Sequence, residues 1–362
     1  MIKYIFNDHR FPYKWNLTDG YPAKGIEPNG LKVFGTFICG GGSTMGYKLA
    51  GYTHLGGVEI DPQVADIYKT NHNPKYLYNQ DIREFNKIID LPDELYNLDL
   101  LDGSPPCSTF SMAGSREKAW GKEKQFREGQ AVQTLDDLVF EYCKTIIKLQ
   151  PKVFLLENVK GIILGNAKAY SKKIIETMEQ AGYKVQIFLL NSASMGVPQR
   201  RERVFFIGHK KELNFKPLKL NFNEKPIPYG EVEKKCKNVL GKQITEAYYK
   251  WWINTPKGKS LSFAHPKGSF FNTIKISDLD VINTITSTDG AKLIHYKYPN
   301  VLSDESIQMC GSYPLDYNFI KIEPKYLIGM SVPPVMTAQI ANQIKMQWFN
   351  SLNKKNESVE ED

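Results

Sequence analysis

Short apolar runs alternate with amphipathic stretches along most of this chain. Apolar runs bounded by Gly, Pro, Asn or Asp are typical of buried strands. They occur at residues 31–37, 53–60, 77–79, 98–101, 153–156, 185–190 and 204–208. Between and after them, we predict helices over residues 44–50, 62–71, 135–149, 168–181 and 335–349. Because strands alternate with helices, we expect an α/β fold with a doubly wound, mostly parallel sheet.

The periodicity changes along the chain and predicts how it is divided. Residues 1–30 have little periodicity and form an N-terminal lead-in of no evident role. Residues 31–209 carry the strand and helix pattern of the large domain. From 210 to 318 the patterning is irregular, with several prolines and aromatic residues, which predicts a second, smaller domain. Residues 319–350 return to the large domain, and residues 351–362 form a charged tail.

Composition narrows the class of protein. No stretch approaches the run of about twenty apolar residues that spans a bilayer, and the N-terminus has no signal-peptide core, so we predict a cytoplasmic protein. The five cysteines are scattered and form no CxxC pair, which indicates neither a disulfide framework nor a metal site.

The positive charge is concentrated in one segment. The net charge of +8 falls within residues 210–300, which hold 16 Lys, no Arg and 8 acidic residues. Such a segment favours a polyanionic partner such as nucleic acid, although a solvated lysine surface has the same composition.

Three consecutive strand ends carry residues suited to an adenosine-type cofactor. The first strand runs into the glycine-rich turn Cys39-Gly40-Gly41-Gly42, where a ligand can approach the backbone. The second ends in Glu59, whose carboxylate can accept bonds from two ribose hydroxyls, and the third in Asp81, which can accept one from an adenine amino group. Each acid alone could equally be a loop or capping residue.

Two further strand ends carry candidate chemistry. Pro105-Pro106-Cys107 follows an apolar strand and could present a nucleophilic thiol at a cleft, or be a structural turn with an idle cysteine. Glu157 follows another apolar strand, where a carboxylate needs a partner or a function. Three of the seven arginines lie at residues 200–203, which favours a use for their planar forks; for Arg203 a structural salt bridge is the alternative.

Together these motifs resemble the S-adenosylmethionine-dependent cytosine-C5 methyltransferases. The matching motifs are Phe37 with Gly41, Gly42 and Gly46; Glu59; Asp81; Pro105-Pro106-Cys107; Glu157-Asn158-Val159; Gln199-x-Arg201-x-Arg203; and Gly329 to Pro334. Two features depart from the family pattern. Cys39 stands where the family usually has Gly, and Met309-Cys310-Gly311 replaces the Arg-Leu-Gln core of the ninth motif.

The resemblance implies a fold, site residues and a mechanism. The fold would be the Rossmann-like class I methyltransferase fold with a target-recognition domain. Cys107, Glu157 and Arg201 would be catalytic. S-adenosyl-L-methionine would contact Phe37, Gly40, Gly41, Gly42, Glu59, Ile60, Asp81, Ile82, Asp102 and Pro105. Nucleic acid would contact Ser108, Gln199 and Arg203, and residues 112–134 would close over the target base.

In the implied mechanism, the Cys107 thiolate adds to C6 of a flipped-out cytosine while Glu157 assists at N3, and C5 then takes the methyl group. We expect a monomer acting on double-stranded DNA at a specific sequence, of the bacterial or phage restriction-modification type, with a cognate restriction endonuclease as a genetic partner. The alternatives are a tRNA cytosine-C5 methyltransferase of the same fold and a catalytically silent nucleic-acid-binding module.

Overall fold

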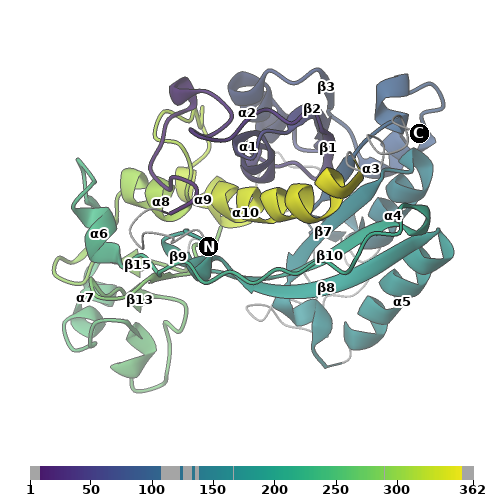
Figure 1. Ribbon diagram of the computed structural model, residues 1–362. Coiled ribbons are helices and arrows are strands. Elements are labelled where there is room, and N and C mark those ends of the chain that lie inside the picture. Colours follow the sequence, from purple (N-terminus) through teal and green to yellow (C-terminus); the bar gives the residue numbers. More distant parts are fainter. Residues whose placement is uncertain are drawn as a thin grey trace.

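The largest element of the computed structural model is a seven-stranded sheet (Figure 1). The structure describes residues 9–106, 138–165, 167–288 and 290–352, and the backbone of two short strands, β5 (Glu123–Lys124) and β6 (Gln133–Thr134). The strands of the large sheet are β1 (Lys32–Thr36), β2 (Thr53–Val58), β3 (Tyr76–Tyr78), β4 (Leu100–Gly103), β7 (Val153–Val159), β8 (Tyr183–Asn191) and β10 (Glu202–Lys210). Each matches a predicted run to within a few residues.

The strand order is β3-β2-β1-β4-β7-β10-β8. Neighbouring strands from β3 to β7 are parallel, and β10 is antiparallel to both β7 and β8. The chain moves outward from β1 to β3 and then returns to place β4 on the other side of β1. This reversal leaves a crevice at the carboxyl ends of β1 and β4, where doubly wound sheets bind ligands. The predicted fold class is confirmed.

Both faces of the sheet are buried at its central strands, which explains the unbroken apolar runs there. Val153 and Leu155 of β7 point into one hydrophobic cluster, and Phe154 and Leu156 point into the other. All four are at most 2% exposed. Full burial of such a side chain contributes about 1.5–3 kcal/mol, so each strand residue stabilises one of the two layers.

Helices cover both faces of the sheet. They are α1 (Gly42–Leu49), α2 (Pro62–His72), α3 (Ile82–Lys87), α4 (Leu138–Leu149), α5 (Ala167–Gln180) and α10 (Pro334–Ile344). The last helix continues as a π-helix, Lys345–Phe349, which confirms the predicted helix near the C-terminus. Met45 of α1 and Val335 of α10 share one core, so these two helices, distant in sequence, pack side by side in the same layer (Figure 1).

A second, smaller sheet lies in the segment whose sequence is irregular. Its strand order is β11 (Leu240–Gln243), β16 (Asn300–Leu302), β15 (Leu293–Ile294), β13 (Ile274–Lys275) and β12 (Lys259–Ser260). With α6 (Tyr229–Glu233) and α7 (Glu246–Trp252) it forms what we call the small domain, residues 229–302. Trp252 is 7% exposed and packs in its core with Leu261 and Ile294, so this tryptophan is structural.

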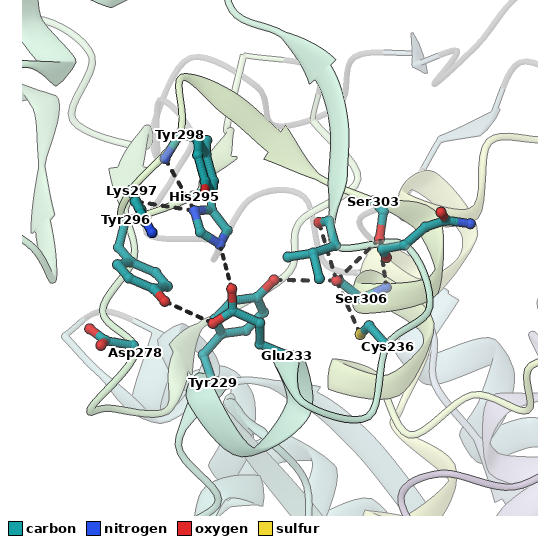
Figure 2. A network of polar contacts seen from close by, with 12 residues as sticks. Tyr229, Glu233, Cys236, Asp278, His295, Tyr296, Lys297, Tyr298, Ser303 and Ser306 are labelled. Carbon is teal, nitrogen blue, oxygen red and sulfur yellow. Dashed lines mark hydrogen bonds and ion pairs between the residues drawn. The ribbon is translucent and has the colours of Figure 1, made fainter.

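A polar network stabilises the interior of the small domain (Figure 2). The His295 ring is fully buried, and its Nδ1 accepts from the backbone N–H groups of Lys297 (3.1 Å) and Tyr298 (3.2 Å). The ring proton therefore lies on Nε2, which donates to Glu233 Oε1 at 3.1 Å. Tyr296 donates to the other carboxylate oxygen at 2.9 Å. Burial lowers the pKa of His295, so the ring is neutral.

The small domain is joined to the large domain by short elements. The two-residue strand β14 (Ile282–Asn283) pairs in parallel with β9 (Gln199–Arg200) of the large domain. Two helices, α8 (Asp304–Cys310) and α9 (Pro324–Met330), lead the chain back to α10. This arrangement brings residues 282–288 and the end of α9 next to the start of β10.

The described part of the lead-in, residues 9–30, has one 3₁₀ turn, Leu17–Asp19, and packs against the rest of the molecule through a few aromatic side chains. Phe11, Tyr13 and Trp15 are at most 5% exposed. The Trp15 indole donates to the Ser312 carbonyl at 3.0 Å. This segment therefore fastens to the chain that follows α8.

Candidate active site

A cavity of about 310 Å³ opens at the carboxyl ends of the strands, at the predicted crevice. Nine of the predicted site residues line it: Phe37, Glu59, Ile60, Asp81, Ile82, Pro105, Glu157, Arg201 and Arg203. Cys107 and Ser108 lie outside the residues that the structure describes, as does the predicted loop 112–134. Pro106, the residue before Cys107 in the sequence, also lines the cavity.

The turn after β1 has a strained backbone. Phe37 and Cys39 have φ of 54° and 49°, in the left-handed region that favours glycine. Cys39 is the position at which this chain departs from the family's usual glycine, and the backbone shows why glycine is normal there. The Cys39 side chain lines the cavity, and burial followed by the nearby Glu59 carboxylate raises its pKa to about 12.

The three glycines of this turn make room for packing and do not line the cavity. A Cβ on Gly40 would overlap Leu327, one on Gly41 would overlap His72, and one on Gly42 would overlap the Val332 carbonyl. These three positions therefore have a packing role, and the cofactor contacts predicted for Gly40, Gly41 and Gly42 stay a prediction. Their small size lets α2 and the chain between α9 and α10 approach the turn closely.

Glu59 is held at the end of β2 by backbone donors. Its two oxygens accept from the N–H groups of Cys39 and Asp61, each at 2.9 Å. Burial raises the pKa of Glu59 to about 7, although these two bonds oppose the shift. The carboxyl group faces the cavity from a fixed position, which suits the predicted contact with ribose hydroxyls.

Asp81 has a local structural role at the end of β3. It caps α3 by accepting from the Arg83 N–H at 2.8 Å, and its Oδ2 forms an ion pair with Arg83 Nη1 at 3.1 Å. This carboxylate has partners on both oxygens and also lines the cavity, and its predicted bond to the adenine amino group stays a prediction.

Asp102 lies behind the cavity wall and not in it. It accepts from Ser43 Oγ at 2.6 Å and from the Tyr47 hydroxyl at 3.1 Å, and burial raises its pKa to about 7. Both donors belong to α1, so Asp102 fastens this helix to the end of β4. Its predicted contact with the cofactor stays a prediction.

The loop that leads to Cys107 is fastened at two points. Ser104 Oγ donates to the Phe37 carbonyl at 3.2 Å, and Asn158 Nδ2 donates to the Pro105 carbonyl at 3.2 Å. Asn158 is 2% exposed, so its amide holds this loop against the end of β7. Asn158 was not among the predicted site residues, although a buried amide directly after an apolar strand indicates a specific partner.

Glu157 and Arg203 form a buried ion pair. They lie on the same face of neighbouring antiparallel strands, two positions apart in register. Arg203 Nε lies 2.9 Å from Glu157 Oε1, and the two side chains are 16% and 12% exposed. Arg203 Nη1 also donates to the Glu202 carbonyl at 2.8 Å. The guanidinium thus fixes the orientation of the Glu157 carboxylate within the cavity.

Gln199 and Arg201 both bond the backbone of one residue, Ile285, in the segment that follows β14. Gln199 Oε1 accepts from the Ile285 N–H at 2.9 Å, and Arg201 Nη1 donates to the Ile285 carbonyl at 3.1 Å. Arg201 Nη2 reaches the Gly329 carbonyl, also at 3.1 Å. Burial, then the charge of Arg203, lowers the pKa of Arg201 to about 9, so the group is still a cation at neutral pH.

Gln199, which we predicted to contact nucleic acid, is buried and bonded within the protein. Its side chain is 1% exposed, and its Nε2 donates to the Cys310 carbonyl at 3.4 Å. Both ends of the amide have internal partners, and the predicted contact of Gln199 with nucleic acid stays a prediction. Gln199 holds residues 282–288, and Ser287 of that segment lines the cavity.

Several cavity residues were not predicted. Ser287 comes from a segment distant in sequence that no local pattern marks, and Met330 belongs to the matched motif Gly329 to Pro334, to which no site role was assigned. Gln80 precedes the predicted acid of the third strand end and also lines the cavity. Among the described residues, no cluster of His, Cys, Asp and Glu could hold a metal ion. Within the same part of the chain, every helix is too short or too polar to cross a bilayer.

Comparison with known proteins gives a consistent assignment. Residues 31–346 match the family model "C-5 cytosine-specific DNA methylase". The chain is 36% identical to the type II methyltransferase M.FnuDI of Fusobacterium nucleatum over 209 residues, 57% of this chain and 53% of that protein. It thus spans about half the length of that relative. It is 27% identical to the type II methyltransferase M1.HphI of Haemophilus parahaemolyticus over 339 residues, 87% of this chain and 86% of that protein.

Solved structures share the fold. A DNA modification methyltransferase encoded within an Escherichia coli prophage superposes with a TM-score of 0.65 at 18% identity, covering 88% of this chain and 99% of that one. Spodoptera frugiperda DNMT2 superposes with a TM-score of 0.60 at 15% identity, covering 87% and 99%. Because the family model covers both domains and the site lies at the expected strand ends, the chain belongs to the C-5 cytosine-specific DNA methylase family.

Proposed function

We propose that this protein transfers a methyl group from S-adenosyl-L-methionine to C5 of a cytosine within a specific sequence of double-stranded DNA. One observation supports this above all others. A single cavity joins the Glu59 strand end to the Glu157–Arg203 pair and to the loop that leads into Cys107. A methyl donor bound at the Glu59 end of the cavity would therefore lie next to a cytosine bound at the Glu157 end.

The residues at the Glu59 end fit an adenosine-containing cofactor. Glu59 offers a carboxyl group at a fixed position for a ribose diol, and Ile60 and Ile82 line the cavity with apolar surface suited to a flat base. Gln80 contributes a buried amide nitrogen that has no hydrogen-bond partner among the described residues. S-adenosyl-L-methionine would supply an electrophilic methyl group on its sulfonium.

The chain's own groups have separate roles in the proposed reaction. The Cys107 thiolate adds to C6 of the cytosine, which makes C5 nucleophilic. Glu157, oriented by Arg203, bonds the N3 side of the ring and supports its protonation. After C5 has gained the methyl group and lost its proton, Cys107 leaves. A stacked base would block the thiol, so the cytosine must be flipped out of the duplex.

Double-stranded DNA is the proposed partner of the lysine-rich segment. Lys257 and Lys275 of the small domain stand 4.3 Å from the ring centres of Tyr296 and Trp252, and other lysines of the segment extend from its surface. Lysines neutralise phosphates without reading sequence. We therefore expect their contribution to DNA affinity to depend strongly on salt concentration. Base reading would fall to Asn, Gln, Ser, Thr or Lys, since residues 210–300 contain no arginine.

Bisulfite sequencing of DNA from a host that expresses the full chain tests the proposal. We expect cytosines protected in one recurring short context, at nearly every occurrence. Cys107→Ser should remove the protection completely yet retain binding of S-adenosylhomocysteine. Cys236→Ser, which changes a thiol of the small domain far from the cavity, should behave as wild type.

The remaining outcomes decide between the alternatives. An active Cys107→Ser protein would overturn the covalent route. Unprotected DNA together with modified cytosines in RNA would replace DNA by RNA as the substrate. If soluble protein modified neither, the function as a methyltransferase would be wrong, and the silent-module alternative would stand.

A further inference from the structure

The described start of the lead-in is an extended segment with one buried side. Phe11, Tyr13 and Trp15 are at most 5% exposed, whereas the residues between them are exposed. In an extended chain successive side chains point to opposite sides, so the three aromatic rings share one side. They belong to one hydrophobic cluster with Val335 of α10 and Tyr229 of the small domain. This side of the segment therefore packs into the core that the two domains share.

The first residues of this segment are bonded to the last helix of the large domain. His9 Nδ1 lies 3.0 Å from Glu224 Oε2, and the Gln339 amide of α10 donates to the same carboxylate. Arg10 Nη2 donates to the Asn342 side chain of α10 at 3.3 Å. Residues 9 and 10 are thus fixed to the large domain through α10.

The following residues interlock with the small domain. Lys14 Nζ donates to the Lys235 carbonyl at 2.7 Å, and the Lys235 ammonium stands 4.5 Å from the centre of the Tyr13 ring. Lys235 comes two residues after the end of α6. The lead-in then returns to the large domain, where the Ala23 N–H donates to the Leu49 carbonyl of α1 at 3.1 Å. It therefore crosses from one domain to the other and back.

Such a crossing bears on how the two domains are oriented. The strands that pair across the joint, β9 and β14, have only two residues each, and domains joined by small interfaces usually move relative to one another. We propose that residues 9–15, which we call the strap, fix the orientation of the small domain over the cavity.

The strap should matter for DNA and not for the cofactor. A duplex would have to contact the lysine-rich small domain and the cavity at the same time. Its apparent affinity therefore falls with the fraction of molecules in the fitting orientation. The cofactor would need only the strand ends of the large domain, around Glu59. This consequence rests on the function proposed above.

A double variant of the full chain, Tyr13→Leu with Lys14→Met, tests the strap. Leucine keeps apolar volume in the shared core but removes the ring beneath the Lys235 ammonium, and methionine removes the bond to the Lys235 carbonyl. By fluorescence anisotropy with a duplex that carries the methylated sequence, we expect about tenfold weaker binding. Calorimetric titration with S-adenosylhomocysteine and the unfolding temperature should stay near wild type. Lys24→Met removes the same charge at an exposed position of the lead-in and should bind DNA as wild type.

Two further readouts separate the strap from other roles of these residues. If Lys14 contacted a phosphate itself, its loss would flatten the dependence of DNA affinity on salt, and a flatter slope would contradict the strap. Hydrogen exchange without DNA follows the joint directly. The amides of β14 should exchange faster in the double variant, while those of β7 keep their wild-type rates.

The strap and the proposed function fail in different ways. Unchanged DNA affinity or unchanged exchange of β14 in the double variant would overturn the strap and leave the proposed function intact. Equal losses of cofactor and DNA binding would show general destabilisation and would overturn the strap as well. If folded wild type binds neither ligand, the proposed function fails, and the exchange rates alone decide on the strap.

Discussion

At the scale of single residues, the ion pair between Glu157 and Arg203 is the best-defined part of the proposed reaction centre. The carboxylate and the guanidinium are both largely buried, 2.9 Å apart, on one face of adjacent strands. A buried carboxylate without a partner would turn or take up a proton. Arg203 is thus a positioning residue that acts through Glu157.

A double-mutant cycle tests this coupling. Arg203→Ala should lower methyl transfer by about tenfold to a hundredfold, because the oriented, charge-assisted bond to Glu157 is lost. In a Glu157→Gln background the same change should cost little. Arg200→Ala is the matched control, since Arg200 pairs with Asp280 at the surface. Additive losses in the double mutant would show that Arg203 acts independently of Glu157.

The residue scale also shows what the sequence could reveal about the site. Glu157 and Arg203 were predicted because each follows or begins an apolar strand at a motif position. The internal contacts of Gln199 and Asp102 were not predicted, because their partners are distant in sequence. Gln199 bonds Ile285, and Asp102 bonds Ser43 and Tyr47. Which atoms a buried amide or carboxylate reaches depends on packing that no local pattern records.

At the scale of elements, the crossing of α1 and α10 depends on one small residue. Gly46 of α1 lies against the Pro334 carbonyl and Thr337 of α10, and a Cβ there would overlap both. Backbone on the opposite side cannot move out of the way as a flexible side chain can. The family's Gly46 is therefore a packing requirement in this chain.

Gly46→Ala should destabilise the protein by about 2 kcal/mol, because overpacking at a helix crossing forces the two backbones apart. We expect the unfolding temperature to fall by roughly 5 °C in calorimetry. Gly290→Ala, at an exposed position where a Cβ meets nothing within 4 Å, is the control and should leave the unfolding temperature unchanged. A Gly46→Ala protein as stable as wild type would mean that the helices are not so closely packed.

The strands of the large sheet could be predicted from the sequence and those of the small domain could not, because only the former are long, continuous apolar runs. The central strands of the large sheet are buried on both faces, so each leaves an apolar run that can be recognised without knowing its neighbours. In the small domain, β12, β13 and β15 are two residues long, too short for an alternating pattern. Their pairing depends on Trp252 and other core residues supplied by α7 and distant loops.

At the scale of the whole molecule, the small domain should respond to acid through His295. Its pKa is lowered in the folded protein, chiefly by burial, while Glu233 opposes the shift. Below the ordinary value of 6.5 the unfolded chain takes up this proton more readily than the folded one. Stability contributed by the neutral ring is therefore complete above that pH and is lost as the pH falls through 6.5 towards the lowered value.

Thermal unfolding at pH 7.5 and 5.5 checks this sign. His295→Asn keeps a side-chain acceptor for the Lys297 and Tyr298 N–H groups but does not titrate. It should be less stable than wild type at pH 7.5, because the bond to Glu233 is lost, and should lose less stability on acidification. Glu59 and Asp102, whose pKa values are raised, act in the opposite direction in both proteins, so the comparison cancels them. Parallel pH curves would contradict the role of His295.

The contact between α1 and α10 also has a consequence for synthesis. The two partners are separated by almost three hundred residues, so the side of α1 that packs against α10 stays uncovered on the nascent chain until residues 334–344 have been synthesised. Contacts between such distant segments slow folding, and apolar surface that waits for a partner is open to aggregation. We therefore expect chains truncated before residue 334 to require chaperones, and the enzyme to become active only after its last helix has docked.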